Sequence, residues 1–283
     1  MTEAADIIAR GISERWIGSS PARRPLVIGL CGAQGSGKTT LATALQSRLT
    51  ATGLRCATLS LDDLYLTLSE REALGCVVHP LLRTRGVPGT HDVGLGLDTI
   101  AALGGEGRVS LPRFDKARDD RLPESAWPVV SAPLDLLLFE GWCVGAVPQD
   151  AAELVEPVNA LEREKDTDGA WRRHVNAALS GAYRPLFDRI DRLILLAAPG
   201  FDVVGDWRTE QEEQLRRVTS PAAGQRIMSA GEISRFIQFY ERLTRHILSE
   251  MPERADLTLS LDASRRVIVH RVNDRTEMDR HCP

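Results

Sequence analysis

The sequence predicts an α/β protein built on a mainly parallel β-sheet of about five strands, flanked by helices. Five short apolar runs recur along the chain, at residues 26–30, 57–61, 136–139, 193–196 and 267–269. Runs that are apolar at nearly every position are typical of strands covered on both faces. The stretches between the runs show helical periodicity. A glycine-rich segment directly after the first run is the third observation that favours this fold class.

The composition is that of an ordinary globular protein. The chain has 283 residues, of which 43% are hydrophobic and 26% charged, and 35 basic against 39 acidic residues give a net charge of −4. A chain of this length can bury a large core without disulfides or metals. The acidic balance disfavours a protein that coats nucleic acid. We therefore expect small-molecule partners, and neither a nucleic-acid nor a membrane partner.

The distribution of apolar residues and cysteines predicts a cytoplasmic protein. The first residues lack the apolar centre of a signal peptide, and no apolar run approaches the roughly 18 residues of a membrane span. The number of cysteines is odd and they form no CxxC pair, which favours reduced thiols packed as small hydrophobes over disulfides or a zinc site. They are Cys31, Cys56, Cys76, Cys143 and Cys282. The sequence does not indicate an oligomeric state.

The chain is expected to form one domain after a short extension. Residues 1–24 are predicted to be a helical extension, because apolar side chains at helical spacing precede the helix-breaking run at residues 18–21. Residues 25–283 are predicted to form a single domain, since no long flexible linker interrupts them. The last apolar run, at 267–269, could pair with a further run at 257–259.

The strongest local signal is the segment GAQGSGKT at residues 32–39, a complete GxxxxGK[ST] match between an apolar run and an amphipathic helix. Its glycines let successive N–H groups face phosphate oxygens at the positive end of the helix dipole. Lys38 can reach the β- and γ-phosphates, and the Thr39 hydroxyl is placed for Mg²⁺. The segment predicts a P-loop NTPase-type sheet that binds a nucleoside triphosphate. The expected nucleotide-binding residues are Gly32, Gln34, Gly35, Ser36, Gly37, Lys38, Thr39 and Thr40.

Two acidic residues are expected near the phosphates. Asp62 follows the second apolar run and Glu140 ends the third. Because the carboxyl ends of parallel strands meet at one sheet edge, both carboxylates should approach the phosphate loop. Asp62 can orient an acceptor hydroxyl and take its proton, although Asp62 or Asp63 could instead cap the next helix. Glu140 is suited to hold Mg²⁺ opposite Thr39. No [NT]KxD motif is present, which disfavours a guanine-specific GTPase.

The order of these motifs resembles the nucleoside kinase, pantothenate kinase and phosphoribulokinase branch of P-loop small-molecule kinases: GxxxxGKT, then SLDDLY at 60–65, then LLFEGW at 137–142. Further segments are similar to the D-glycerate 3-kinase family: RGVPGTHD at 85–92, LPRFDK at 111–116 and WRTEQE at 207–212. The resemblance covers about residues 26–269. It implies ATP- and Mg²⁺-dependent phosphorylation of D-glycerate to 3-phosphoglycerate.

The resemblance gives two middle loops a role in binding a small anionic acceptor. The implied substrate-binding residues are Asp62, Tyr65, Arg85, His91, Arg113 and Lys116. A guanidinium can hold the substrate carboxylate with two parallel bonds, and Lys116 can neutralise charge on the transferring phosphoryl group. Taken alone, the basic residues from 113 to 121 are equally typical of a solvated face, and His91 of a packed histidine.

Related kinases also close a helical lid, which is expected at about residues 205–230. Arg216 on this segment is the implied lid cation, and the implied catalytic residues are Asp62, Lys38, Lys116 and Arg216. Alternatively, the lid arginines pair with Glu210, Glu212 and Glu213 in an ordinary surface helix.

Two other functions stay open. A pantothenate- or uridine-type kinase would act on another small hydroxyl substrate. Of these two, the nucleoside alternative is disfavoured, because few aromatic residues near the acceptor loops could stack on a base. A P-loop ATPase that switches a protein partner would use the same phosphate loop without needing an acceptor site. Adenine contacts are expected from late loops, around residues 262–266.

Overall fold

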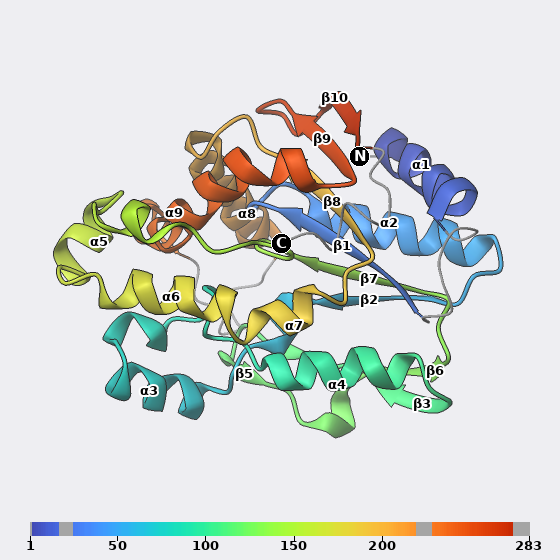
Figure 1. The fold of residues 1–283 in the computed structure, drawn as a ribbon, viewed down its shortest axis with the longest axis horizontal. Helices are drawn as coiled ribbons and strands as arrows, with labels where there is room; N and C mark the ends of the chain where they lie inside the picture. Colours follow the sequence, from blue (N-terminus) through green and yellow to red (C-terminus); the bar gives the residue numbers. More distant parts are fainter. Residues whose placement is uncertain (1, 17–24, 219–227, 274–283) are drawn as a thin grey trace.

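A six-stranded sheet forms the centre of the computed structural model, which describes residues 2–16, 25–218 and 228–273 (Figure 1). Its strands are β1 (Leu26–Gly32), β2 (Cys56–Ser60), β7 (Leu136–Gly141), β8 (Arg192–Ala197), β9 (Leu257–Leu261) and β10 (Val267–Val272). The strand order is β10-β9-β8-β1-β7-β2. The predicted α/β fold is confirmed, with one strand more than the five expected, because the run at 257–259 is a full strand.

The strands that carry the site run parallel and end at one edge of the sheet. β1 lies between β7 and β8, and β2 lies beside β7. Leu30 of β1 and Ser60 of β2 are both in register with Glu140 of β7. β10 pairs antiparallel with β9 and is the exception in an otherwise parallel sheet. The register therefore brings the segments after β1, β2 and β7 together.

Helices pack on both faces of this sheet (Figure 1). They are α1 (Thr2–Gly11), α2 (Lys38–Ala51), α3 (Leu68–Val77), α4 (Val93–Leu103), α5 (Ala160–Lys165), α6 (Ala170–Ser180), α7 (Tyr183–Phe187), α8 (Asp202–Val218) and α9 (Ala230–Arg254). Val27 of β1 belongs to a core that includes residues of α4, α6, α7 and α9. Its neighbour Ile28 belongs to the opposite core, with α1, α2 and Trp207 of α8. Alternate strand residues thus fill both faces, as apolar runs without polar positions require.

Short helical turns and two small sheets form much of the remaining structure. The turns are η1 (Ile12–Trp16), η2 (Leu61–Leu64), η3 (Pro80–Arg83), η4 (Glu124–Ala126) and η5 (Ala151–Leu154). The small sheets pair β3 (Gly107–Ser110) with β6 (Val129–Ala132), and β4 (Phe114–Asp115) with β5 (Asp120–Arg121). Leu61, predicted to end a strand, instead begins η2, because the Ser60 hydroxyl accepts the Asp62 N–H at 3.3 Å and turns the chain.

The N-terminal helix α1 packs on α2 through Ala5 and Ile8. The division into an extension and one domain stays a prediction. Four cysteines are free thiols, and Cys282 lies outside the described residues. Of the helices in the described ranges, none combines the length and the apolar character that a membrane span requires.

Candidate active site

The phosphate loop connects the buried strand β1 to α2. Gly35 and Gly37 have φ angles of 77° and 89°, in the left-handed region that favours glycine. Gly37 precedes α2 and provides no side-chain cap for the first N–H groups of the helix. Uncapped N–H groups at a helix N-terminus bind anions, and the glycine turn aims them into the loop. Lys38 is the first residue of α2, so its ammonium starts from the same helix end.

Two residues far along the chain hold this loop from outside. A Cβ atom on Gly35 would lie 2.6 Å from Cβ of Trp207, so the loop and α8 are in tight contact. Arg265 Nε donates to the Gly35 carbonyl at 2.6 Å, and its guanidinium lies 5.1 Å from the centre of the Trp207 ring. The loop around residues 262–266, expected to contact adenine, thus supports the phosphate loop. No sequence signal indicated this support.

The residues predicted to hold a metal come together where the start of α2 meets the end of β7. Thr39 Oγ1 donates to Glu140 Oε1 at 3.1 Å. Glu140 is only 3% exposed, and within the described part of the chain its second carboxylate oxygen has no hydrogen-bond partner. A buried carboxylate oxygen without a partner is unfavourable, and a hydroxyl and a carboxylate are the oxygen ligands that Mg²⁺ prefers. Thr39 and Glu140 therefore fit this ion.

The remaining ligands of a Mg²⁺ ion at this position would be water and phosphate oxygens rather than further side chains. Among the described residues, no three His, Cys, Asp or Glu side chains come together as a metal-binding group. Mg²⁺ characteristically keeps several water ligands and uses one or two protein groups with phosphate oxygens. The buried Ser36 Oγ and Gln34 Oε1, which also have no partner in the described part, lie in the same loop.

Asp62 receives two hydrogen bonds at the start of η2. The Tyr65 hydroxyl donates to Oδ1 at 2.8 Å, and Lys116 Nζ donates to Oδ2 at 2.6 Å. Burial alone would raise the pKa of Asp62, but the charges of Lys116 and Lys38, together with these two bonds, lower it well below its usual range. Asp62 is therefore ionised at neutral pH, within electrostatic reach of the phosphate-loop lysine.

The alternative that Asp62 or Asp63 caps a helix is wrong. Ser60 caps η2, and Thr67 caps α3 with a capping box. Asp63 instead accepts the Phe114 N–H at 3.1 Å and pairs with Arg113 at 3.3 Å. It thereby ties the second strand end to the small hairpin β4–β5.

The cations of the two acceptor loops are all paired with carboxylates. We call this set the acceptor network; it comprises Asp62, Asp63, Arg85, Arg113, Lys116 and Asp119. Arg85 pairs with Asp119, which also accepts from the fully buried Arg71 at 3.0 Å. Asp119 has a positive φ of 56° in the β4–β5 turn. Neither Asp119 nor Arg71 stood out in the sequence, because only the fold brings Asp119 into contact with Arg85 and with Arg71 of α3.

Three side chains, Tyr65, His91 and Phe114, pack together beside the acceptor network, and we call them the aromatic wall. Tyr65 and His91 are 3% and 5% exposed, and their rings stack at 4.5 Å between centroids. Phe114 meets Tyr65 edge-on at 5.2 Å. His91 Nδ1 lies 2.6 Å from the hydroxyl of Tyr183, a residue that sequence reasoning missed. Burial lowers the pKa of His91 to about 3, so the imidazole is neutral near pH 7.

The predicted lid begins in α8. Its Arg208 pairs with Glu212 one turn later and lies 5.5 Å from the Phe236 ring centre. At this position the alternative of an ion-paired helix holds. Arg216 belongs to α8, but its side chain lies outside the described residues, as do residues 219–227. The predicted role of Arg216 stays a prediction.

Comparison with known proteins identifies the family. Residues 27–172 match the Phosphoribulokinase / Uridine kinase family model. The chain belongs to this family. A relative from Schizosaccharomyces pombe, described as the uncharacterized kinase mug58, is 36% identical over 231 residues, which are 78% of this chain and 80% of the relative.

Two further relatives of this kinase are D-glycerate 3-kinases. The chloroplastic enzyme of Arabidopsis thaliana is 33% identical over 266 residues, which are 87% of this chain but only 54% of that protein. The structure of the Cryptococcus neoformans enzyme matches with a TM-score of 0.77 at 26% identity and covers 96% of this chain and 98% of that chain. The resemblance to the glycerate 3-kinases is confirmed. The chain is a P-loop small-molecule kinase, a phosphotransferase that uses ATP and an alcohol acceptor.

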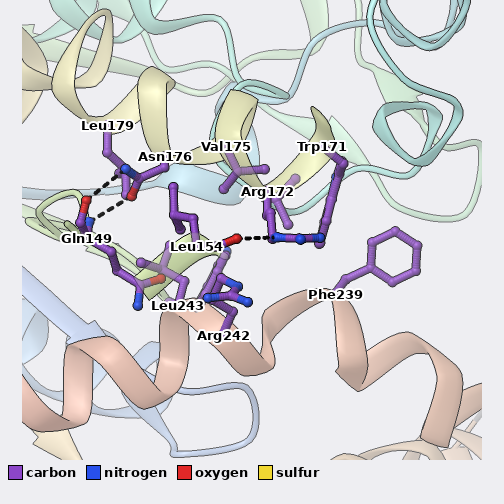
Figure 2. Close-up of a pocket in the computed structure, with 12 residues that line it drawn as sticks. Gln149, Leu154, Trp171, Arg172, Val175, Asn176, Leu179, Phe239, Arg242 and Leu243 are labelled. Atoms are coloured by element: carbon purple, nitrogen blue, oxygen red, sulfur yellow. Dashed lines mark hydrogen bonds between the residues drawn. The ribbon is translucent and has the colours of Figure 1, made fainter. Parts of the chain in front are cut away.

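This kinase also encloses a cavity away from the phosphate loop. Residues of α6 and α9 line it, among them Trp171, Arg172 and Phe239 (Figure 2). Its volume of about 20 Å³ suffices for about one water molecule, far less than a nucleotide needs. Arg172 Nε donates to the Leu154 carbonyl at 2.7 Å at its rim. The cavity belongs to the packing of the segment between β7 and β8.

Proposed function

We propose that this kinase transfers the γ-phosphoryl group of ATP to the 3-hydroxyl of D-glycerate, with Mg²⁺ bound beside the triphosphate. The observation that carries the proposal is the position of Asp62, an ionised carboxylate that belongs to the acceptor network and lies within electrostatic reach of Lys38. The D-glycerate 3-kinases among its relatives favour this acceptor.

On the nucleotide side, the N–H groups of residues 32–40 and the ammonium of Lys38 bind the phosphates. Thr39 and Glu140 hold Mg²⁺, which offsets the charge of the triphosphate. Fixed donors around the γ-phosphate stabilise the charge of the transition state without reorganising during the reaction. Arg216 on the lid helix is the further cation that we assign to this charge.

On the acceptor side, Asp62 accepts a hydrogen bond from the 3-hydroxyl and aims its oxygen at the γ-phosphorus. A new O–P bond forms, the bond to the β-phosphate oxygen breaks, and Asp62 takes the hydroxyl proton. Its low pKa makes Asp62 a weak base at rest, so the proton moves late, when the new bond has made the oxygen more acidic. Lys116 leaves Asp62 for the transferring phosphoryl group, which strengthens Asp62 as a base.

The packing of the aromatic residues beside the acceptor network supports a small acid over a nucleoside. Tyr65 and Phe114 are the aromatic rings expected to stack on a base, yet they pack against each other and are 3% and 8% exposed. A buried ring has no open face for a base. Arg85 and Arg113 supply the cations for a substrate carboxylate, by exchanging their present carboxylate partners for it.

A coupled assay with purified protein, ATP and Mg²⁺ tests the proposal. D-glycerate should be phosphorylated in preference to uridine and pantothenate. Enolase should consume the product only when a phosphoglycerate mutase is added, because enolase acts on the 2-phosphate. Chelation of Mg²⁺ should abolish turnover, and its re-addition should restore it. ATP hydrolysis without any phosphorylated acid would contradict the proposal and favour a partner-switching ATPase.

A further inference from the structure

The imidazole of His91 contains a buried nitrogen that nothing in the described chain satisfies. His91 is 5% exposed, and its Nε2 has no hydrogen-bond partner among the described residues. A buried polar atom without a partner costs about 1–3 kcal/mol, so such atoms are rare unless a ligand or a water completes them.

The surroundings of the ring determine which nitrogen carries the proton. Tyr183 accepts the Gly89 N–H at 3.0 Å and lies 2.6 Å from His91 Nδ1. A phenol has one proton to donate. With one lone pair of the hydroxyl oxygen taken by the Gly89 N–H, donation of that proton to Nδ1 satisfies both the hydroxyl and Nδ1. Burial keeps the imidazole neutral, so its single N–H is at Nε2.

The stacking with Tyr65 shows where this N–H points. Tyr65 and His91 face each other in an isolated antiparallel bridge, so their side chains leave the backbone on the same side. Their rings are stacked with an interplanar angle of 25°. The Tyr65 ring extends toward Asp62, to which its hydroxyl donates. The imidazole lies alongside that ring, and the Asp62 charge acts on it, so we place its outer edge, which carries Nε2, toward Asp62.

We propose that the His91 Nε2–H donates a hydrogen bond to the substrate hydroxyl next to the one that is phosphorylated, and so selects 2-hydroxy acids. The inference rests on the proposed function, because Asp62 must hold the 3-hydroxyl. An uncharged donor suits an uncharged oxygen, whereas the substrate carboxylate has the cations of the acceptor network. Tyr183 is a positioning residue, since it fixes the proton at Nε2 without touching the substrate.

The acceptor 3-hydroxypropanoate, which lacks the 2-hydroxyl, tests this role. The wild-type enzyme should prefer D-glycerate over it by about 10²-fold in kcat/KM, because a site built for a hydroxyl rejects an analogue that leaves its donor unpaired. Near-equal kcat/KM for the two acceptors would overturn the inference without any variant. Failure to phosphorylate D-glycerate at all would overturn the proposed function itself.

A matched pair of substitutions separates the donor from packing. The amide of His91→Asn can take the place of Nδ1 but has nothing at Nε2, whereas the amide nitrogen of His91→Gln can reach the Nε2 position. His91→Asn should reduce the preference for D-glycerate to within about threefold, and His91→Gln should keep most of it. Tyr183→Phe should lower the preference by about three- to tenfold.

ATP affinity and melting temperature are measured for each variant to show that it is folded. A purely structural role for His91 predicts that Asn and Gln lower turnover of both acceptors equally and leave the preference unchanged. That result would overturn the inference.

Discussion

The nucleotide side and the acceptor side of this kinase are prepared for their ligands in opposite ways. Around the phosphate loop, the buried oxygens Ser36 Oγ and Glu140 Oε2 lack partners within the described chain, and the start of α2 has no side-chain cap. In the acceptor network, by contrast, Lys116 and Arg85 are already paired with Asp62 and Asp119. The phosphate side offers unsatisfied oxygens, whereas the charged groups of the acceptor network are satisfied and His91 Nε2, beside that network, lacks a partner among the described residues.

This difference separates affinity from specificity. A ligand that satisfies unpaired groups adds interactions, so the phosphate side should supply most of the binding free energy. An anion that enters the acceptor network must exchange one ion pair for another, and such exchanges yield little net free energy. The acceptor side is therefore suited to position and select its ligand. Substitutions on the two sides should accordingly change different kinetic constants.

Asp62→Asn should have the largest effect. It leaves the phosphate loop intact but removes the carboxylate that orients the acceptor and takes its proton, so kcat should fall by about 10³-fold. ATP affinity, measured by calorimetry, should stay within about twofold because no phosphate contact is lost. The exposed Asp98→Asn on α4 is the matched control and should change neither constant. An equal loss of ATP affinity would instead place Asp62 in the metal or phosphate shell.

Lys38→Met should affect both constants. Removing a cation from the γ-phosphate should lower kcat by about 10²-fold and also weaken ATP binding, since the charge acts in the ground state and the transition state. Lys165→Met, on the exposed side of α5, removes the same charge elsewhere. Stopped-flow phosphoryl transfer and nucleotide titration would measure the two effects. Unchanged ATP affinity would show that Lys38 contributes only during transfer.

Gly35→Ala should weaken ATP binding by about tenfold, because a Cβ atom 2.6 Å from Trp207 Cβ forces the loop away from α8. Gly53→Ala is the control for backbone strain, since Gly53 has a similar φ of 91° but open space around it. Both variants should lose some thermal stability, but only Gly35→Ala should lose nucleotide affinity. Equal ATP affinity in the two variants would show that the contact with Trp207 does not shape the loop.

Lys116→Ala should change the pH dependence of kcat. In the wild type the lowered pKa keeps Asp62 ionised throughout the mildly acidic range. Without Lys116, burial raises the pKa of Asp62, so the protonated and inactive form appears at higher pH. The acidic limb of kcat should therefore move upward by about one to three pH units. In kcat profiles from pH 4 to 8 the wild type should show no acidic limb from Asp62, whereas the variant should lose kcat toward pH 4; identical profiles would contradict the pairing.

Local patterns predicted the sheet and the phosphate loop, but not the acceptor network. Residues 26–30 and 136–139 lie within β1 and β7 because a strand covered on both faces leaves an apolar run in the sequence. The strands β4 and β5 have two residues each and leave no such pattern.

Local sequence patterns likewise revealed only part of the candidate site. The glycines and Lys38 form one contiguous motif, so a single segment reveals them. Asp119, Tyr183 and Arg265 act across distances of 34, 92 and 230 residues along the chain. Only the folded arrangement makes them neighbours of Arg85, His91 and Gly35.

The bond between Arg265 and the Gly35 carbonyl has a consequence for the order in which the protein is made. The ribosome releases the phosphate loop early, when β1 and α2 can already begin to fold. The residue that holds the outer side of that loop is synthesised 230 residues later. A nascent chain therefore carries the phosphate-binding motif long before it carries Arg265. The loop gains this outer support only once the turn between β9 and β10 has been synthesised.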